Sequence, residues 1–124
     1  LPYMKRQGRG KIINIASGVA FSGLPLFLHY TTSKGGVVSL TRGLAKEVGD
    51  YNINVNAVAP GMVWTPAAQG MVSEELAKEI AAKQAIHRVV QPEDVAGAVL
   101  FFASEDSDMI TGQTLLINGG EVLH

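Results

Sequence analysis

The sequence contains no cysteine, almost no excess of either charge and no long apolar run. Without cysteine it can form neither a disulfide framework nor a thiolate metal site, and we expect a protein of a reducing, cytoplasmic compartment. Ten basic residues against eleven acidic ones leave no basic surplus for nucleic acid. No apolar run reaches the ~18 residues of a membrane span, so neither nucleic acid nor a membrane is an expected partner. The three histidines, His29, His87 and His124, lack the spacing of metal ligands, and no metal is expected.

Apolar residues and glycine are what the sequence has in quantity, at 47% and 14 residues of 124. The apolar share is too high for a disordered chain and suits a packed core. The length suits one domain or part of one. Glycine exceeds its average share of about 7%, so tight turns or close backbone approaches are expected.

Three short apolar runs predict β-strands, at Lys11–Ala16, Ile53–Ala59 and Thr114–Ile117. The first run has several β-branched residues and few polar ones, which is typical of a strand covered on both faces in a parallel sheet. Pro60 and Gly61 stop the second run, and a pair of glycines stops the third soon after its end.

Three helices are expected between these strands. Gly49 is the predicted C-terminal cap of the first, Ser73 the N-cap of the second, and Pro92 occupies the first helical position of the third. Their expected extents are about Leu28–Val48, Ser73–Ile86 and Gln91–Ala103.

Strands that alternate with helices predict an α/β fold with a parallel sheet and right-handed crossovers. About three apolar strands make a poor independent sheet, because an edge should remain open to pairing. We therefore expect these residues to belong to a larger α/β domain.

Ser17, Tyr30 and Lys34 are the candidate catalytic residues. Ser17 directly follows the first strand, where open α/β sheets place their ligands. Tyr30 and Lys34 are four residues apart at the start of the long helix, so they share a face and the ammonium can stabilise a phenolate. Together the three can form a proton-transfer site. An amphipathic tyrosine, a solvated lysine and a turn serine explain the same residues, so the triplet alone leaves function open.

The arrangement of several motifs along the chain is more informative than the triplet. The motifs occur in the order Lys11–Ser17, Tyr30–Lys34, Asn54–Gly61, Thr65, Ile110–Gln113 and Gly119–Gly120. This order resembles the short-chain dehydrogenase/reductase family, specifically its C-terminal half, over nearly the whole chain. The resemblance implies the C-terminal half of a Rossmann-like doubly wound parallel sheet. Residues 1–124 would be a partial dinucleotide-binding domain, incomplete at its N-terminus.

The resemblance also implies a role for each residue of the triplet. Ser17 would position the substrate oxygen, Tyr30 would act as general acid and base, and Lys34 would bind the nicotinamide ribose and tune Tyr30.

A second set of implied residues comes from the family's Pro-Gly segment. Pro60, Gly61, Val63 and Thr65 would border the nicotinamide, with the Val63 backbone and the Thr65 hydroxyl facing its carboxamide.

Some parts of the family's pattern are not found in these residues. They are the glycine-rich pyrophosphate loop, the Asn-Asn-Ala-Gly segment and a fourth catalytic residue, an asparagine. Asn118 stands where the family usually has aspartate, and Ala16 where serine is frequent. The residue that selects NAD over NADP would also lie elsewhere, so the expected cofactor is NAD or NADP, with NAD favoured.

The implied activity is that of an NAD(P)-dependent oxidoreductase moving hydride to or from a secondary alcohol or ketone. The alternative is an inactive truncated fragment of such an enzyme, with no independent cofactor binding. Residues at about 62–86 would form a substrate lid. Apolar residues near the site suggest a hydrophobic or aromatic substrate, although apolar loop residues more often cover the core or an oligomer contact; they are Phe21, Leu24, Phe27, Trp64, Met71 and Val72.

The long helix offers two further predictions. Gly35, Ser39 and Gly43 lie four residues apart and form a smooth row on which another helix can pack. That row can serve the active-site side instead, but family members commonly pair this helix across a two-fold axis, so we expect a homodimer or homotetramer. An apolar stripe should bury against the sheet of its own chain; its members are Val37, Leu40, Thr41, Leu44 and Val48.

Overall fold

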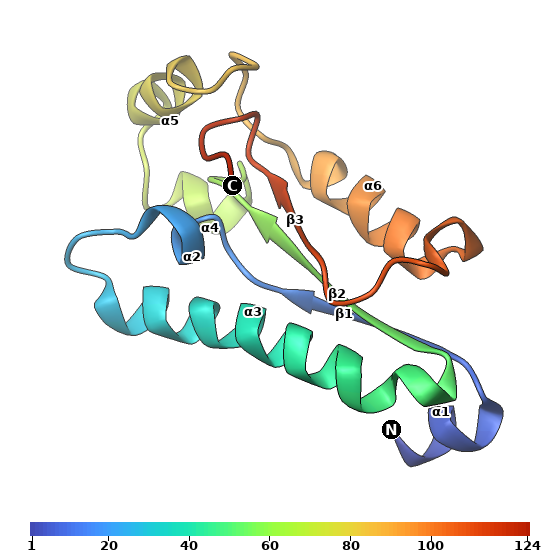
Figure 1. Ribbon diagram of the computed structural model, residues 1–124. Coiled ribbons are helices and arrows are strands. Elements are labelled where there is room, and N and C mark those ends of the chain that lie inside the picture. Colours follow the sequence, from blue (N-terminus) through green and yellow to red (C-terminus); the bar gives the residue numbers. More distant parts are fainter.

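Three parallel strands form the centre of the protein in the computed structural model, which describes all 124 residues (Figure 1). Parallel pairing places Gly10 opposite Ile53, and Ala57 opposite Thr114. The predicted α/β class and parallel sheet are confirmed, and the last strand has its predicted bounds. Across the sheet the strands are β1 (Gly10–Ile15), β2 (Ile53–Pro60) and β3 (Thr114–Ile117).

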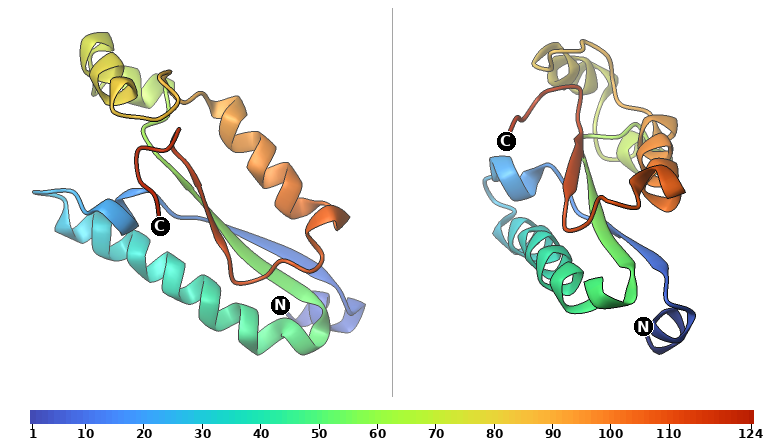
Figure 2. Two further views of the ribbon diagram at one scale, coloured as in Figure 1. Left: turned by 45° about the horizontal axis from the view of Figure 1, so that its top comes forward. Right: turned by 45° about the vertical axis from the view of Figure 1, so that its right-hand side comes forward.

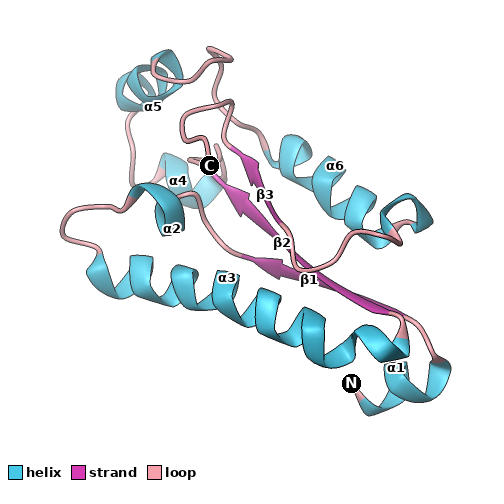
Figure 3. Cartoon of the chain, in the orientation of Figure 1, coloured by secondary structure: helices cyan, strands magenta, loops and turns pink.

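Helices cover both faces of this sheet. Figure 2 shows α3 on one face and α6 on the other, and Figure 3 separates the helices from the strands. The longest helix, α3, packs on β1 and β2, whereas α6 contacts all three strands. No helix combines the length and the apolar character needed to cross a bilayer. The helices are α1 (Pro2–Gln7), α2 (Val19–Ser22), α3 (Leu28–Val48), α4 (Pro66–Gln69), α5 (Glu74–Ala82) and α6 (Pro92–Ala103), with 3-10 turns η1 (Gly49–Tyr51) and η2 (Glu105–Ser107).

The short helices α2 and α4 were not expected from the sequence. Each has four residues, which is little more than one turn. Such a helix is too short for a 3.6-residue apolar period to show, so it looks like a loop. The helix α6, by contrast, begins at Pro92 as predicted.

The helix α3 has its predicted bounds, and Gly49 is its C-cap residue, as predicted. Gly49 keeps right-handed backbone angles (φ −57°) and continues into η1. The chain reverses at Asn52, whose φ of 55° is left-handed. Asparagine enters this region more readily than most side chains, because its short polar group can bond to the local backbone.

The helix α5 starts as predicted and stops early. At its start the Ser73 hydroxyl accepts a hydrogen bond from the Leu76 N–H (3.2 Å). It ends at Ala82, not near Ile86. Lys83 is the C-cap residue, and Gln84 after it is buried.

The buried face of α3 differs from the predicted stripe. Leu40 is 58% exposed, so the expectation that it faces the sheet is wrong. Val37 and Leu44 are only partly buried, and the buried positions are Val38, Thr41, Ala45 and Val48. Both sets fit helical spacing. The set that packs contains Ala45, where the predicted set has Leu44. A small side chain at this place lets the helix lie close to β2, which has Ala57 and Ala59.

The outer strand β1 is less covered than its apolar sequence suggests. β2 pairs with β1 on one side only, and Ile15 at the end of β1 is 52% exposed. Helices α3 and α6 contact β1 from its two faces, as predicted, but its residues are only partly buried. The expected open edge is present.

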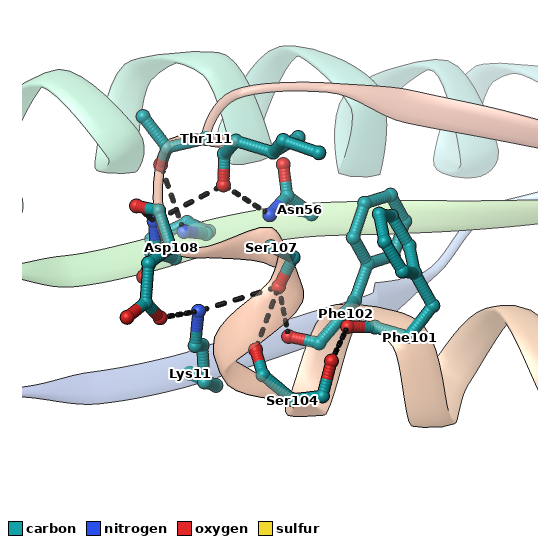
Figure 4. A network of polar contacts seen from close by, with 11 residues as sticks. Lys11, Asn56, Phe101, Phe102, Ser104, Ser107, Asp108 and Thr111 are labelled. Atoms are coloured by element: carbon teal, nitrogen blue, oxygen red, sulfur yellow. Dashed lines mark hydrogen bonds and ion pairs between the residues drawn. The ribbon is translucent and has the colours of Figure 1, made fainter.

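A polar network fastens the turn before β3 to the middle strand (Figure 4). Asn56, 1% exposed, donates from its amide to the Ile110 carbonyl (2.8 Å) and accepts from the Gln113 N–H (3.0 Å). Nearby, the Lys11 ammonium pairs with the Asp108 carboxylate (2.6 Å). The buried amide thus bonds to two backbone groups of this turn, and the Asn54 amide shares the Ile110 carbonyl with it (3.1 Å).

Substituting Asn56 with alanine should destabilise the whole protein by about 2 kcal/mol, because the Gln113 N–H loses its partner and the Ile110 carbonyl keeps only the bond from Asn54. Denaturant unfolding measures the change. Gln113→Ala is the matched control, since that exposed side chain bonds only to a nearby carbonyl, and it should cost less than about 0.5 kcal/mol. Equal effects of the two substitutions would contradict the assigned role of Asn56.

Candidate active site

The loops that follow the three strands meet at the carboxyl edge of the sheet, where open α/β folds bind ligands. The Gly18 N–H donates to the Pro60 carbonyl (2.9 Å), and the Gly61 N–H donates to the Ile117 carbonyl (3.0 Å). Glycine is needed at position 61, because a Cβ there would lie 2.9 Å from the Asn118 Cβ. These contacts hold the three loops in one surface.

Ser17 lies at this edge, just beyond β1. Its side chain is 9% exposed, and its hydroxyl oxygen accepts a hydrogen bond from the Val19 N–H (3.4 Å) at the start of α2. The hydroxyl proton has no acceptor within the protein. Ser17 can therefore donate a hydrogen bond to a ligand oxygen.

Tyr30 and Lys34 are brought to the same edge by a contact between α3 and β1. The Lys34 ammonium donates to the carbonyl of Ile15 (2.9 Å), two residues before Ser17. It also lies 5.7 Å from the centre of the Tyr30 ring. Tyr30 is 38% exposed, so its phenol is accessible to a ligand. The ammonium has three protons and uses one here, which leaves two for a ligand.

The Pro-Gly segment leads from the same edge into α4. Pro60 is the last residue of β2, and Val63 forms a parallel bridge with Val90. Thr65 caps α4, where its hydroxyl oxygen accepts from the Ala68 N–H (3.2 Å). The hydroxyl of Thr65 is thus held in place and keeps its proton for another partner.

Of the six apolar residues expected near the site, three are partly buried (Phe21, Trp64 and Val72) and three are exposed (Leu24, Phe27 and Met71). Phe21 packs against the core beside Ala16 and faces His124 with ring centres 4.5 Å apart, so it covers the core. Leu24 and Phe27 are 41% and 46% exposed, and Met71 is 82% exposed.

Leu26 is a residue of this region that the sequence did not single out. It is 94% exposed, and its φ of 67° is left-handed. A branched apolar residue rarely adopts this conformation, and such strain gathers at functional segments. No sequence signal could have identified Leu26, because the strain arises from the path of the loop between α2 and α3.

The sequence also did not indicate an ion pair between Arg88 and Asp94. The two side chains form a bidentate pair with both N–O distances at 2.6 Å. The hydrogen bonds from Arg88, and then the Gln91 N–H, lower the pKa of Asp94 to about 2. The pair anchors the connection between α5 and α6. The two residues are six positions apart and do not belong to one helix, so their spacing in the sequence does not indicate that they pair.

The donor set at the edge fits one end of a nicotinamide cofactor. A hydroxyl, a phenol and an ammonium suit ribose hydroxyls and a carbonyl or alcohol oxygen. Ser17, Tyr30 and Lys34 provide these groups. No glycine-rich turn at a helix N-terminus, the usual cradle for a diphosphate, occurs among the described residues.

The fold and this edge define a Rossmann-type α/β protein. The family model described as enoyl-(acyl carrier protein) reductase matches residues 1–121. The 7alpha-hydroxysteroid dehydrogenase of Bacteroides fragilis is 41% identical over 124 residues, covering 100% of this chain and 48% of the relative. The chain belongs to the short-chain dehydrogenase/reductase family, as the sequence motifs predicted.

Other relatives agree with this assignment. The 3-oxoacyl-(acyl-carrier-protein) reductase FabG of Thermotoga maritima is 42% identical over 124 residues, covering 99% of this chain and 50% of the relative. A gluconate 5-dehydrogenase from Burkholderia cenocepacia, solved with NADP and tartrate, has a TM-score of 0.90 at 33% identity and covers 97% of this chain and 48% of that structure. The chain spans about half the length of the curated relatives it matches.

Asp94→Asn should lower the melting temperature of the whole protein at pH 7, because it removes the partner of Arg88. The carboxylate has a depressed pKa, so its contribution is present above the unfolded value of 3.8 and is lost as the pH falls towards about 2. The difference in melting temperature from the wild type should therefore narrow below pH 4.

Glu93→Gln is the control, because Glu93 is exposed and has no ion pair. It should leave the melting temperature nearly unchanged over the same pH range. A melting temperature for Asp94→Asn equal to that of Glu93→Gln at pH 7 would show that the pair does not stabilise the fold.

Proposed function

We propose that the whole protein is an oxidoreductase that transfers hydride between NAD or NADP and a secondary alcohol or ketone. The observation that carries this proposal is the contact of Lys34 with the Ile15 carbonyl at 2.9 Å. This contact joins the first turns of α3, which carry Tyr30 and Lys34, to the end of β1, two residues before Ser17. Relatives named as dehydrogenases and reductases support the same class.

In this proposal the three side chains divide the handling of the substrate oxygen and the cofactor. When bound, the nicotinamide accepts hydride from an alcohol carbon or supplies it to a ketone carbon. Tyr30 takes the hydroxyl proton in the oxidative direction and returns it to the carbonyl oxygen in the reductive direction. Ser17 donates a hydrogen bond to that oxygen. Lys34 holds the ribose hydroxyls with its two free protons, and its charge favours the phenolate.

The Pro-Gly segment would hold the nicotinamide ring. Val63 and Thr65 follow β2 at the same edge, and the cap bond to Ala68 fixes the Thr65 hydroxyl oxygen. Solved relatives hold NAD in one structure and NADP in another, so the proposal concerns the nicotinamide that both share, and NAD is taken as the cofactor to test first.

For the substrate we propose a hydrophobic or aromatic alcohol or ketone. The segment between Ser17 and Tyr30 exposes the apolar side chains of Leu24, Leu26 and Phe27, at 41%, 94% and 46%. Exposed apolar groups that gather beside a polar site suit an apolar ligand. The segment around α4 and α5 would then act as the lid over it. One relative is named for a hydroxysteroid, which is a largely apolar alcohol.

We also propose that the whole protein is a homo-oligomer, with α3 at a self-complementary interface. A Cβ on Gly35, Gly36 or Gly43 would meet no atom within 4 Å, so packing within this chain does not require glycine there. Each glycine inside a helix costs about 0.5–1 kcal/mol relative to alanine, which indicates another reason for its presence. Leu40, 58% exposed, lies on the same outer surface. A second α3 packed on this smooth row would account for both features.

Tyr30→Phe should reduce turnover at least ~10²-fold, because it removes the proton-transfer group and keeps the ring. Steady-state kinetics with saturating NAD and a secondary alcohol measures this, and a binding titration should find cofactor affinity retained. Lys34→Ala, in contrast to Tyr30→Phe, should weaken cofactor binding.

Tyr51→Phe is the matched control for this test. Tyr51 also has a lysine ammonium over its ring, that of Lys5 at 4.3 Å, but lies at the other end of α3. It should keep normal turnover. Near-normal turnover in Tyr30→Phe would exclude Tyr30 as the proton-transfer group.

Ser39→Arg and Gly43→Arg should each dissociate the oligomer, because a long charged side chain would stand between two closely packed helices. Light scattering at micromolar concentration measures the mass. Glu105→Arg, an exposed site on η2, should leave the mass unchanged. A monomeric wild type, or an oligomer unaffected by both α3 substitutions, would refute the interface.

A further inference from the structure

A buried glutamine follows the helix α5. Gln84 is 2% exposed, although glutamine is usually a surface residue. With its amide oriented to satisfy its neighbours, the nitrogen donates to the carbonyls of Ile86 (3.0 Å) and Arg88 (2.7 Å). The Arg88 N–H also donates to the Ile86 carbonyl (2.8 Å). Gln84 therefore bends the connecting segment 83–90 into a compact turn around its own side chain.

This turn is fastened to the loop that follows β3. The Ile86 N–H donates to the Gly119 carbonyl (2.8 Å). A Cβ on Gly119 would lie 2.6 Å from the Gln84 amide, and one on Gly120 would lie 2.9 Å from the Ala85 Cβ. Both glycines have left-handed φ values of 61° and 80°. The two segments thus approach as closely as glycine permits, and Figure 1 shows the segment that leaves α5 passing over the loop after β3.

The far end of the same segment holds the loop that follows β2. The Trp64 N–H donates to the Val90 carbonyl (2.9 Å), and Val63 pairs with Val90 in a parallel bridge. Val90 is 4% exposed, so this contact is buried. Val63 and Thr65, which border the nicotinamide in the proposed function, are therefore placed by a segment whose shape depends on Gln84.

We propose that Gln84 is a positioning residue for the cofactor-side loop Val63–Thr65. Its amide folds the segment 83–90, the folded segment clamps the loop after β3, and its end at Val90 fixes Val63 and Trp64. The proposal rests on the proposed function for its consequence, namely that loss of the Gln84 amide weakens nicotinamide cofactor binding. The clamp itself is a property of the chain and can be measured without a ligand.

Gln84→Met in the whole protein tests the clamp, because methionine keeps the length and approximate volume of glutamine and lacks the amide. Without ligand, hydrogen exchange at the Trp64 and Ile86 amides should become at least tenfold faster, while exchange in β2 is unchanged. Gln7→Ala is the control, since Gln7 is exposed at the end of α1 and its side chain makes no hydrogen bond. It should leave both amides unchanged.

The same variants are then titrated with NAD and NADP. Gln84→Met should raise the Kd of the bound cofactor, and the KM for it, at least fivefold, and should leave kcat at saturating cofactor within twofold. A residue that only supported the fold would not separate KM from kcat in this way. Faster exchange with unchanged cofactor affinity would overturn the positioning role.

Two further measurements keep the outcome decisive. If Gln84→Met does not fold, Gly119→Ala approaches the clamp from the other side and should accelerate exchange at the same two amides. In the wild type, the Trp64 and Ile86 amides should exchange slowly and at similar rates, and fast exchange at either would overturn the clamp. A wild type that binds neither NAD nor NADP would refute the proposed function, while the exchange data would still decide whether the clamp exists.

Discussion

The close approach of α3 to the middle strand is the constraint on which the rest of the structure depends. Ala57 and Ala59 of β2 are fully buried, and with Ala16 and Val38 they form one of the two core clusters. Small side chains on the strand let the helix axis come near, so dispersion contacts are dense although none of the four cluster members is large. A larger side chain on β2 would push α3 outward, and the contact of Lys34 with the end of β1 would be lost with it.

The candidate site follows from that approach and from the parallel strands. Parallel pairing sends every carboxyl end to one edge, and α3 starts at the same edge because it must run back along the sheet. Tyr30 and Lys34 therefore belong to the first turns of a helix whose position is set far away, at Ala45 and Val48 near its other end. The positions of the candidate catalytic side chains therefore depend on core packing by residues that do not contact the site.

Buried side-chain amides hold two irregular segments of the fold in place. Asn56 satisfies the turn before β3, and Gln84 satisfies the turn after α5. In each case a buried amide replaces regular secondary structure as the partner of backbone groups, which makes an irregular segment as well defined as a helix. Such segments can then carry ligand contacts without the mobility that loops usually have.

The sequence by itself determined α3, α6 and β3, because the apolar patterns of helices and strands are local properties of the chain. It also determined the spacing of Ser17, Tyr30 and Lys34. It also predicted the family from the order of its motifs. Only the tertiary structure decided that α3 buries Val38 in place of Leu40, that Asn52 and not Gly49 reverses the chain, and that Leu26 is strained. The burial of Gln84 and the pairing of Arg88 with Asp94 belong to the same group. Each of these depends on the shape of a surface contributed by distant residues, and a pattern read along one segment contains no information about that surface.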